Sequence, residues 1–367
     1  MKLNNLRTQV LGRNFEYYEK IDSTQKEIWS RVAKNKIENG TVICAGVQES
    51  GVGTHGRVWH TDEKNNIAFS FYLNLNVEIE KLDGVTLEIA EIIRSIFEKE
   101  YNILLEIKKP NDIVYNQKKI GGILTETKLV GKFVRDLVVG IGINTNQTEF
   151  ADEIHDIATS IKNEFGFSVD NVLHSENNGD IHFNLYIPKS YNGSKAYALF
   201  ITLPGYEGLY FQGVGVNIRQ ENFGFEAQKY NANMIIAAPQ LNGWDEDSAD
   251  ETIVLVEYLL SAYNIDKSKV YIEGYSGGGE TASQAVGKRS DLFTAYLQVN
   301  SQWDGEYESV AKAKLPVYIA IGRDDEYYGS KKSQNAYDTL YNLYKKQGLT
   351  DDEIDKILVP DLGPQEE

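Results

Sequence analysis

Two groups of residues could do chemistry, and they lie in different halves of the chain. In the first half, Gly51, Gly53 and Gly56 stand in a short loop beside Arg57, and Lys108 follows later. Glycine lets a backbone approach a phosphate closely, because a Cβ atom would obstruct the contact. Fixed cations neutralise the negative charge that builds up when a carboxylate meets an α-phosphate. These residues fit the formation of an acyl-adenylate, with Lys108 and Arg57 as its catalytic cations.

The second half carries the pattern G-x-S-x-G from Gly274 to Gly278, directly after a strand-like run and before a helical segment. In such an elbow the serine occupies a tight strand-to-helix turn, and the N–H that follows it helps to bind an oxyanion. Ser276 is therefore the candidate catalytic nucleophile.

Alternating strand and helix patterns must position these residues. In residues 1 to 165, a helical pattern begins at Thr24 and later strand-like runs end at residues 137 to 144, which predicts an α+β domain with a mixed sheet. In residues 166 to 367, β-rich runs alternate with helical segments, which is typical of a doubly wound, parallel α/β sheet. The predicted join lies near residues 162 to 169, where a helical pattern stops at a glycine.

Composition and charge exclude several classes of protein. The 367 residues are 41% hydrophobic and 25% charged, as in folded chains, and the apolar runs are far shorter than the roughly 20 residues of a membrane-spanning helix. The N-terminal stretch lacks a signal-peptide pattern and Cys44 is the single cysteine, so we expect a cytoplasmic location. Residues 1 to 165 hold 21 basic and 24 acidic residues, net −3, and residues 166 to 367 hold 16 and 30, net −14. This acidity disfavours nucleic acid as a partner.

Five motifs in the first half occur in a recognisable order. They are Asp22-Ser23-Thr24-Gln25, Gln48 to Trp59, Lys108 to Asp112, Lys119 to Glu126 and Gly140 to Asn144. Their order and spacing resemble the catalytic domain of biotin-protein ligases, over about residues 10 to 165. The resemblance implies a class II synthetase-like fold, the use of biotin, ATP and Mg²⁺, and transfer of biotin to a lysine on the biotin carboxyl carrier domain of a carboxylase.

The resemblance also assigns ligand-binding residues. It implies that Ser23, Thr24 and Gln48 hydrogen-bond the ureido head of biotin, and that Lys108 contacts both the carboxylate and the phosphate. No residue is predicted to bind a metal directly. The full set of predicted ligand residues is Ser23, Thr24, Gln48, Gly51, Gly53, Gly56, Arg57, Lys108, Asn111, Gly121, Gly122 and Asn144.

The first half also departs from the family pattern. Val52 and Thr54 stand where the family commonly has arginines, and Lys109 stands where a tryptophan is common. With fewer cations to close the loop, we expect weaker retention of the adenylate. The chain carries neither the DNA-binding segment nor the small β-barrel that accompany the domain elsewhere, so DNA-binding repressor activity is not expected.

Residues 166 to 360 resemble α/β-hydrolases of the esterase and prolyl-oligopeptidase-like kind, with Leu203 to Gly208 at the position of the second oxyanion donor. In that resemblance Asp325 takes the place of the triad acid, and an aspartate that caps a loop turn is the alternative. The chain order of the triad requires a histidine after Asp325, and all five histidines precede Ser276: His55, His60, His155, His174 and His182. We therefore expect Ser276 to be a poor nucleophile, because no general base takes its proton.

The sequence thus predicts a biotin-protein ligase domain fused to a hydrolase-like domain that lacks its triad histidine. Both segments look shorter than their families, which suggests a chimera of natural or artificial origin. Two alternatives stay open. One is a serine hydrolase of the α/β-hydrolase fold, and the other is a chain without catalytic activity whose acidic half acts as a binding or solubilising module. The sequence gives no oligomeric state.

Overall fold

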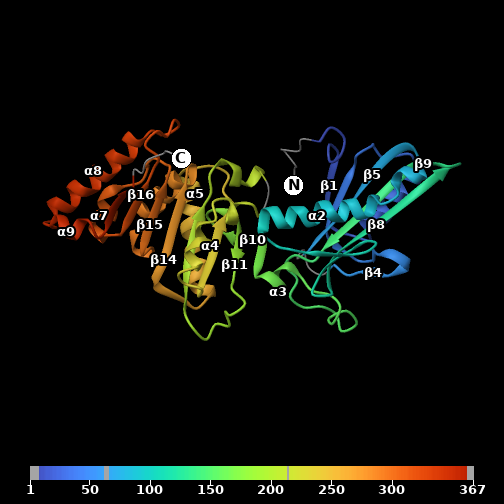
Figure 1. The fold of residues 1–367 in the computed structure, drawn as a ribbon, viewed down its shortest axis with the longest axis horizontal. Coiled ribbons are helices and arrows are strands. Elements are labelled where there is room, and N and C mark those ends of the chain that lie inside the picture. The colour runs from blue at the N-terminus through green and yellow to red at the C-terminus, as the bar shows by residue number, and fades with distance from the viewer. Residues whose placement is uncertain (1–7, 62–65, 213–214, 362–367) are drawn as a thin grey trace. The chain divides into compact units, whose positions relative to one another are not determined.

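The computed structural model describes residues 8–61, 66–212 and 215–361, which form two compact units (Figure 1). The first unit is Met1–Phe167 and the second is Ser168–Glu367. Each unit has its own main sheet, and each sheet carries one of the two candidate sites.

The sheet of the first unit is mixed, as predicted. Its strands run in the order β1-β2-β5-β9-β8-β7-β6, with β1 parallel to β2 and the remaining neighbours antiparallel. The strands are β1 (Phe15–Ile21), β2 (Val42–Gln48), β5 (Ile67–Glu78), β6 (Glu106–Lys108), β7 (Asp112–Tyr115), β8 (Lys118–Val130) and β9 (Phe133–Ile143). A short hairpin and the helices complete the unit: β3 (Gly51–Val52), β4 (Val58–Trp59), α1 (Thr24–Ala33), α2 (Val85–Tyr101) and α3 (Ile161–Phe165).

Helix α1 begins after Ser23, whose side chain accepts a hydrogen bond from the backbone N–H of Lys26, as an N-cap serine does. Its buried face carries Ile28 and Val32, one turn apart. These side chains pack against buried residues of the sheet, Ile43, Tyr72 and Val138. The start of α1 is thereby fixed above the sheet, next to the end of β2.

The sheet of the second unit is mostly parallel, as predicted. Its order is β10-β11-β13-β12-β14-β15-β16-β17; β11 is antiparallel to β13, and the pairs from β13 to β17 are parallel. The strands are β10 (Phe167–Ser175), β11 (Gly179–Tyr186), β12 (Tyr197–Leu203), β13 (Met234–Pro239), β14 (Ile265–Tyr275), β15 (Ala295–Val299), β16 (Val317–Ala320) and β17 (Leu358–Asp361). The helices are α4 (Phe223–Gln228), α5 (Glu246–Ala262), α6 (Gly277–Lys288), α7 (Tyr307–Ala313), α8 (Ser330–Lys346) and α9 (Asp351–Ile354).

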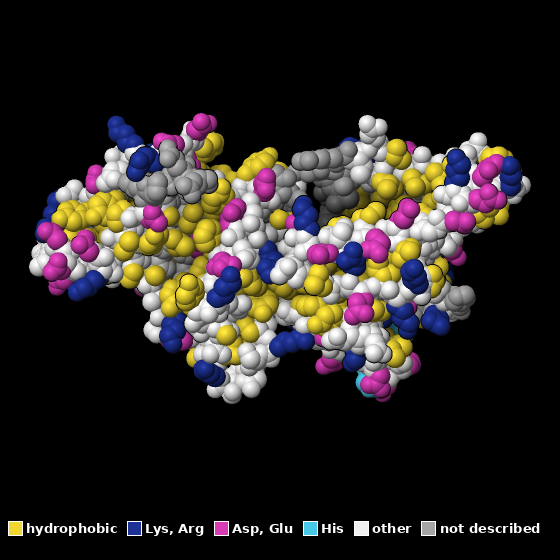
Figure 2. Space-filling view, in the orientation of Figure 1, with side chains coloured by type: hydrophobic (Ala, Val, Ile, Leu, Met, Phe, Trp, Pro, Cys, Tyr) yellow, Lys and Arg dark blue, Asp and Glu magenta, His cyan; other side chains and the backbone are white. Residues whose placement is uncertain are grey.

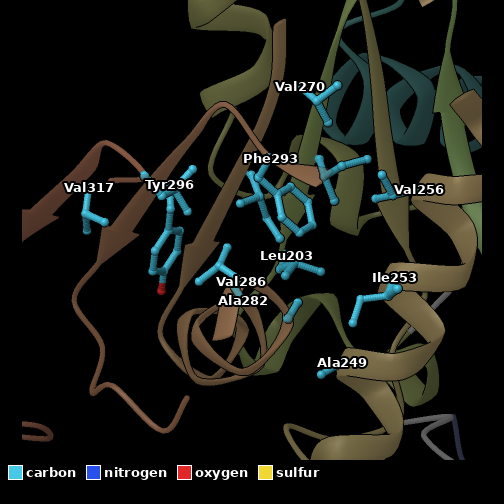
Figure 3. Close-up of a cluster of buried hydrophobic side chains, with 14 of the residues drawn as sticks. Leu203, Ala249, Ile253, Val256, Val270, Ala282, Val286, Phe293, Tyr296 and Val317 are labelled. Atoms are coloured by element: carbon cyan, nitrogen blue, oxygen red, sulfur yellow. The ribbon is translucent and has the colours of Figure 1, made fainter. Parts of the chain in front are cut away.

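The core of the second unit lies between the sheet and helices α5 and α6 (Figure 3). Strands β12 and β13 are buried along their whole length, because the faces of a parallel sheet are covered in such folds. Tyr296 on β15 points into the core, and its hydroxyl donates to the carbonyl of Gly279 at 2.9 Å. The core thus fixes the helix that begins immediately after Ser276.

Hydrophobic side chains gather on the visible face of the second unit, over β14, β15 and β16 (Figure 2). They surround an apolar groove whose lining includes Phe200, Met234, Tyr271, Leu297, Tyr318 and Val359. No helix within the described residues combines the length and the apolar character needed to cross a membrane.

Candidate functional site

Two neighbouring cavities lie in the first unit, and four residues line both of them: Gly53, Thr54, Trp59 and Lys119. The narrow cavity has a volume of about 40 Å³ and is bordered by the start of α1, the end of β2 and the glycines of β8 and β9. The wide cavity has a volume of about 280 Å³ and is bordered by Arg57, Lys108 and Asn144. Ligands in the two cavities would meet at the shared wall.

One end of the narrow cavity is a buried polar cluster at the N-terminus of α1. The Oε1 atom of Gln48 accepts hydrogen bonds from the backbone N–H of Thr24 at 2.9 Å and from its hydroxyl at 3.1 Å. The same hydroxyl lies 2.8 Å from the hydroxyl of Ser70. Ser23 and Thr24 are only 1% and 2% exposed. The cluster is therefore held in place before any ligand arrives.

Gln25 brings an unsatisfied acceptor to the same cavity. Its Nε2 donates to Glu126 Oε2 at 2.9 Å, and Trp29 Nε1 donates to that oxygen at 2.6 Å. Gln25 Oε1 is buried without a hydrogen-bond partner among the described residues. A Cβ atom at Gly140 would lie 2.8 Å from this oxygen, so only glycine leaves it accessible. An unpaired buried oxygen costs free energy, which a ligand N–H would recover.

Trp59 forms the shared wall between the two cavities. A Cβ atom at Gly142 would lie 2.3 Å from its Cε2 atom, and one at Gly122 would lie 2.9 Å from Lys119 Nζ. These two glycines therefore let the indole ring and the Lys119 side chain lie against the sheet. Lys119 Nζ is 5.6 Å from the indole ring centroid and 2.6 Å from Asp112 Oδ1.

The two cavities contain most of the ligand residues predicted from the sequence. Ser23, Thr24, Gln48, Asn111 and Gly122 line the narrow cavity. Arg57, Lys108 and Asn144 line the wide one, and Gly53 lines both. Three predicted residues are absent from the described lining of both cavities, namely Gly51, Gly56 and Gly121.

These three glycines have roles in the backbone instead. A Cβ atom at Gly51 would lie 2.4 Å from the carbonyl oxygen of Trp59, so this glycine allows the β3-β4 hairpin to close. Gly56 has a φ of +73°, a conformation that favours glycine. At Gly121 a Cβ atom would lie 3.1 Å from the carbonyl oxygen of Gly142 on the neighbouring strand.

The two predicted asparagine ligands hold the cavity walls. Asn111 Nδ2 donates to the carbonyl of Ile123 at 3.0 Å, which ties the start of β7 to β8. Asn144 Nδ2 donates to the carbonyl of Thr159 at 3.0 Å. Both amide groups therefore position neighbouring backbone.

Three Lys and Arg side chains line the two cavities of the described part of the first unit: Arg57, Lys108 and Lys119. Lys108 and Arg57 are exposed and border only the wide cavity, whereas Lys119 borders both. The sequence interpretation gave Lys119, Gln25 and Trp59 no role. All three lie within motifs that carry the resemblance, so their place in those motifs was the available signal.

The second unit contains the predicted nucleophile elbow. Ser276 follows β14, precedes α6 and has φ 53° and ψ −128°, which is strained for a residue with a side chain. A Cβ atom would lie 2.4 Å from the carbonyl oxygen of Gly278 if placed on Gly274, and 2.1 Å from the carbonyl oxygen of Leu203 if placed on Gly278. Only glycine fits at these two positions.

The loop after β12 lies beside the elbow, where the second oxyanion donor is expected. A Cβ atom at Gly205 would lie 3.0 Å from Tyr275 Cδ1 and 3.3 Å from Ser276 Cβ. Burial raises the pKa of Tyr275, and the charges of Glu221 and Asp325 raise it further.

Asp325 caps a turn. Its Oδ1 atom accepts hydrogen bonds from the backbone N–H groups of Tyr327, Tyr328 and Gly329 at 3.1, 2.7 and 3.3 Å. This is the alternative that the sequence left open for the residue.

The two histidines of the second unit are paired elsewhere. His182 Nδ1 lies 2.6 Å from Asp170 Oδ1, and this hydrogen bond raises the pKa of His182. His174 Nδ1 lies 2.6 Å from Asp180 Oδ1. Both histidines stand on β10 and β11, which are separated from β14 by β13 and β12.

The two units match different families of known proteins. Residues 17–144 match the biotin/lipoate A/B protein ligase family, and residues 241–353 match the prolyl oligopeptidase family. These matches confirm both resemblances seen in the sequence, to a biotin ligase domain and to an α/β-hydrolase region.

Several known proteins resemble the first unit. The bifunctional ligase/repressor BirA of Bacillus subtilis is 38% identical over 167 residues, which cover 45% of this chain and 51% of that protein. The BirA protein of Bacillus spizizenii is 40% identical with the same coverage. The chain thus spans about half the length of these curated relatives.

Two solved structures are similar to parts of the chain. The biotin protein ligase from Aquifex aeolicus in complex with biotin and ATP is 31% identical with a TM-score of 0.34, over 41% of this chain and 60% of that one. A thermostable esterase is 17% identical with a TM-score of 0.42, over 65% of this chain and 78% of that one.

Proposed function

We propose that the first unit, residues 1–165, is an ATP-dependent biotin-protein ligase. It would join biotin to the α-phosphate of ATP and then transfer the biotinyl group to a lysine of a biotin carboxyl carrier domain. The observation that carries the proposal is the wall of Trp59 and Lys119 between the two cavities, because it brings a single cation to the place where two ligands meet.

The narrow cavity suits the ureido head of biotin. A ureido group offers two N–H donors and one carbonyl acceptor. Gln25 Oε1 is an acceptor in need of a donor, and the hydroxyl of Ser23 can supply a donor. The ureido group thus matches the buried polar atoms that line this cavity.

The wide cavity suits ATP. Arg57 and Lys108 place positive charge along it, where phosphate oxygens need neutralising. No group of three or more His, Cys, Asp or Glu residues in the described ranges could hold a metal ion. When bound, Mg²⁺ would take its ligands mainly from the ATP phosphates and water, as it often does, and it would neutralise phosphate charge.

In the adenylation step, a carboxylate oxygen of biotin forms a bond to the α-phosphorus of ATP, and the bond from that phosphorus to pyrophosphate breaks. Lys119 would hold the carboxylate and the α-phosphate together and balance the charge that develops between them. In the transfer step, the acceptor lysine amine attacks the acyl carbon, AMP leaves, and the amine loses a proton.

The test is biotin-dependent release of pyrophosphate from ATP and Mg²⁺ by the full chain. Lys119→Ala should slow the release by about 10² to 10³-fold, whereas Lys108→Ala should mainly raise the KM for ATP, because Lys108 borders only the wide cavity. Lys118→Ala is the matched control, since Lys118 is the neighbouring residue of β8 outside both cavity linings. Wild-type protein that releases no pyrophosphate in response to biotin would refute the proposal.

A second candidate function is serine hydrolysis by residues 166–367, favoured by the strained backbone of Ser276. Such strain at an elbow holds the serine hydroxyl clear of the backbone and open to a substrate. Turnover of a short-chain ester that is lost in Ser276→Ala would support this function, and identical rates of the two proteins would refute it.

A further inference from the structure

Glu126 sets the orientation of the Gln25 amide beside the narrow cavity. Gln25 is only 3% exposed, and its Nε2 donates to Glu126 Oε2 at 2.9 Å and to the carbonyl of Val138 at the longer distance of 3.5 Å. An ionised carboxylate and a backbone carbonyl can only accept hydrogen bonds, so the NH₂ group of the amide must face them. The amide oxygen of Gln25 therefore points away from Glu126.

Trp29 supports this orientation from the same helix. It stands one turn after Gln25 on α1, and its Nε1, which can only donate, lies 2.6 Å from the same oxygen of Glu126. Two donors thus converge on one carboxylate oxygen. An amide at position 126 would offer N–H groups as well as an oxygen, so it would no longer determine which end of the Gln25 amide faces it.

The Oε1 atom of Gln25 faces the space over Gly140. A Cβ atom on Gly140 would lie 2.8 Å from this oxygen and 3.3 Å from Ser70 Oγ. All three residues line the narrow cavity. Because Oε1 is buried without a hydrogen-bond partner among the described residues, this wall of the cavity offers a fixed acceptor to an N–H donor of a ligand.

We propose that Gln25, oriented by Glu126, makes the site select acids whose ring carries N–H donors and reject acids of similar length that lack them. This inference rests on the biotin-ligase function proposed above. Gln25 would contact the substrate and is a specificity-determining residue. Glu126 acts through Gln25 and is a positioning residue.

Biotin and lipoate are the two acids that this arrangement would separate. The family that residues 17–144 match is named after both of them. Each is a pentanoic acid with a ring at the end of its chain, but the ureido ring of biotin has two N–H groups, whereas the dithiolane ring of lipoate has none. Lipoate would leave Gln25 Oε1 buried and unpaired. A site built around a buried polar group rejects such a ligand more strongly than an apolar pocket would.

The experiment compares the two acids as ligands of the full chain. Titration calorimetry gives the Kd of biotin, displacement of biotin gives the Kd of lipoate, and biotin-dependent pyrophosphate release is measured in parallel. Gln25→Leu keeps the approximate size of the side chain and removes its amide. We expect this variant to bind biotin about 5- to 150-fold more weakly, the effect of one buried hydrogen bond, and to bind lipoate equally or more tightly.

Glu126→Gln tests the positioning role, because Glu126 lies outside both cavity linings and the substitution keeps the shape of the side chain. The new amide lets Gln25 turn its NH₂ group toward the cavity, so biotin should bind more weakly than to the wild type. In the Gln25→Leu background the same substitution should cause no further loss, since Glu126 acts only through Gln25. Glu88→Gln, at an exposed position of α2, is the matched control and should bind both acids as the wild type does.

The possible results separate this inference from the ligase function. A ratio of lipoate Kd to biotin Kd that is unchanged in Gln25→Leu would overturn the inference and leave the ligase function standing. Fully additive effects of Gln25→Leu and Glu126→Gln would overturn the positioning role of Glu126. Wild-type protein that neither binds biotin nor releases pyrophosphate in response to it would overturn both proposals.

Discussion

Lys119 lies over Trp59, with its Nζ atom 5.6 Å from the indole ring centroid, and the two side chains separate the cavities of the first unit. The ammonium is also paired with Asp112 at 2.6 Å. A cation over an indole face is attracted by the ring, so its direction is set before a ligand binds. A positive charge held at a fixed place stabilises a transition state without reorganisation when the reaction occurs.

The first prediction concerns how much the positive charge of Lys119 accelerates adenylation. Lys119→Ala should slow adenylation by about 10² to 10³-fold, the usual result of removing one group that stabilises a developing charge. Single-turnover formation of biotinyl-adenylate at saturating biotin and ATP measures the chemical step directly. A rate within twofold of the Lys118→Ala control would show that a group other than Lys119 stabilises the charge that develops during adenylation.

The second prediction concerns the glycine under the indole ring. In Gly142→Ala the new Cβ would lie 2.3 Å from Trp59 Cε2, so the ring must move into the space of the ligands. Overpacking of this kind typically costs about 1 to 3 kcal/mol. Biotin should therefore bind roughly 5- to 140-fold more weakly, as measured by titration calorimetry. Equal affinity of the variant and the wild type would mean that Trp59 does not border the biotin site.

The third prediction uses Glu273, a fully buried residue of β14. Burial raises its pKa to about 8, while a hydrogen bond from Thr202 at 2.7 Å lowers it. The folded protein therefore keeps this carboxyl protonated at a pH at which the unfolded chain has already lost the proton. The resulting stabilisation is complete below the ordinary pKa of 4.5 and is lost as the pH rises through about 8.

Thermal unfolding between pH 4 and 9 tests this prediction. Glu273→Gln keeps the shape and removes the titration, so its melting temperature should exceed that of the wild type above pH 7, with little difference near pH 4. Glu326→Gln, at an exposed position, is the control. Parallel curves for Glu273→Gln and wild type would contradict the assignment.

Local patterns were sufficient to predict some elements and candidate residues. The start of the helix at Thr24 was predictable because a helix start needs a capping residue, and Ser276 because a G-x-S-x-G run permits few backbone conformations, whereas Ser23 and Thr24 became candidate ligand residues only through the family resemblance. The mixed and parallel sheets followed from the order of strand and helix patterns. In each case the residues that decide the structure are close together in the sequence.

The missed residues depend on contacts between distant segments. Lys119 meets Trp59 across the glycine faces of β8 and β9. Gln25 reaches Glu126 across 101 residues of sequence. No periodicity or spacing encodes such pairs, because they arise only when the strands are packed side by side.

The last prediction concerns Val52 and Thr54, which stand where the resembling family commonly has arginines. Both residues border the narrow cavity, and Thr54 borders the wide one as well. Neither side chain offers a cation to an adenylate phosphate, so the intermediate should dissociate faster than from a site with two arginines. A released acyl-adenylate reacts with any accessible amine.

We therefore expect the protein to biotinylate lysines of an unrelated protein, such as albumin, when it is given biotin, ATP and Mg²⁺. The Val52→Arg, Thr54→Arg double variant should reduce this labelling several-fold while labelling of a carrier domain persists, because an arginine fork binds phosphate in a bidentate manner. Streptavidin blots of both acceptors over time measure the ratio. A reaction without ATP provides the adenylate-free background. Albumin labelling at that background, together with full labelling of the carrier, would show that the loop retains the adenylate without the arginines.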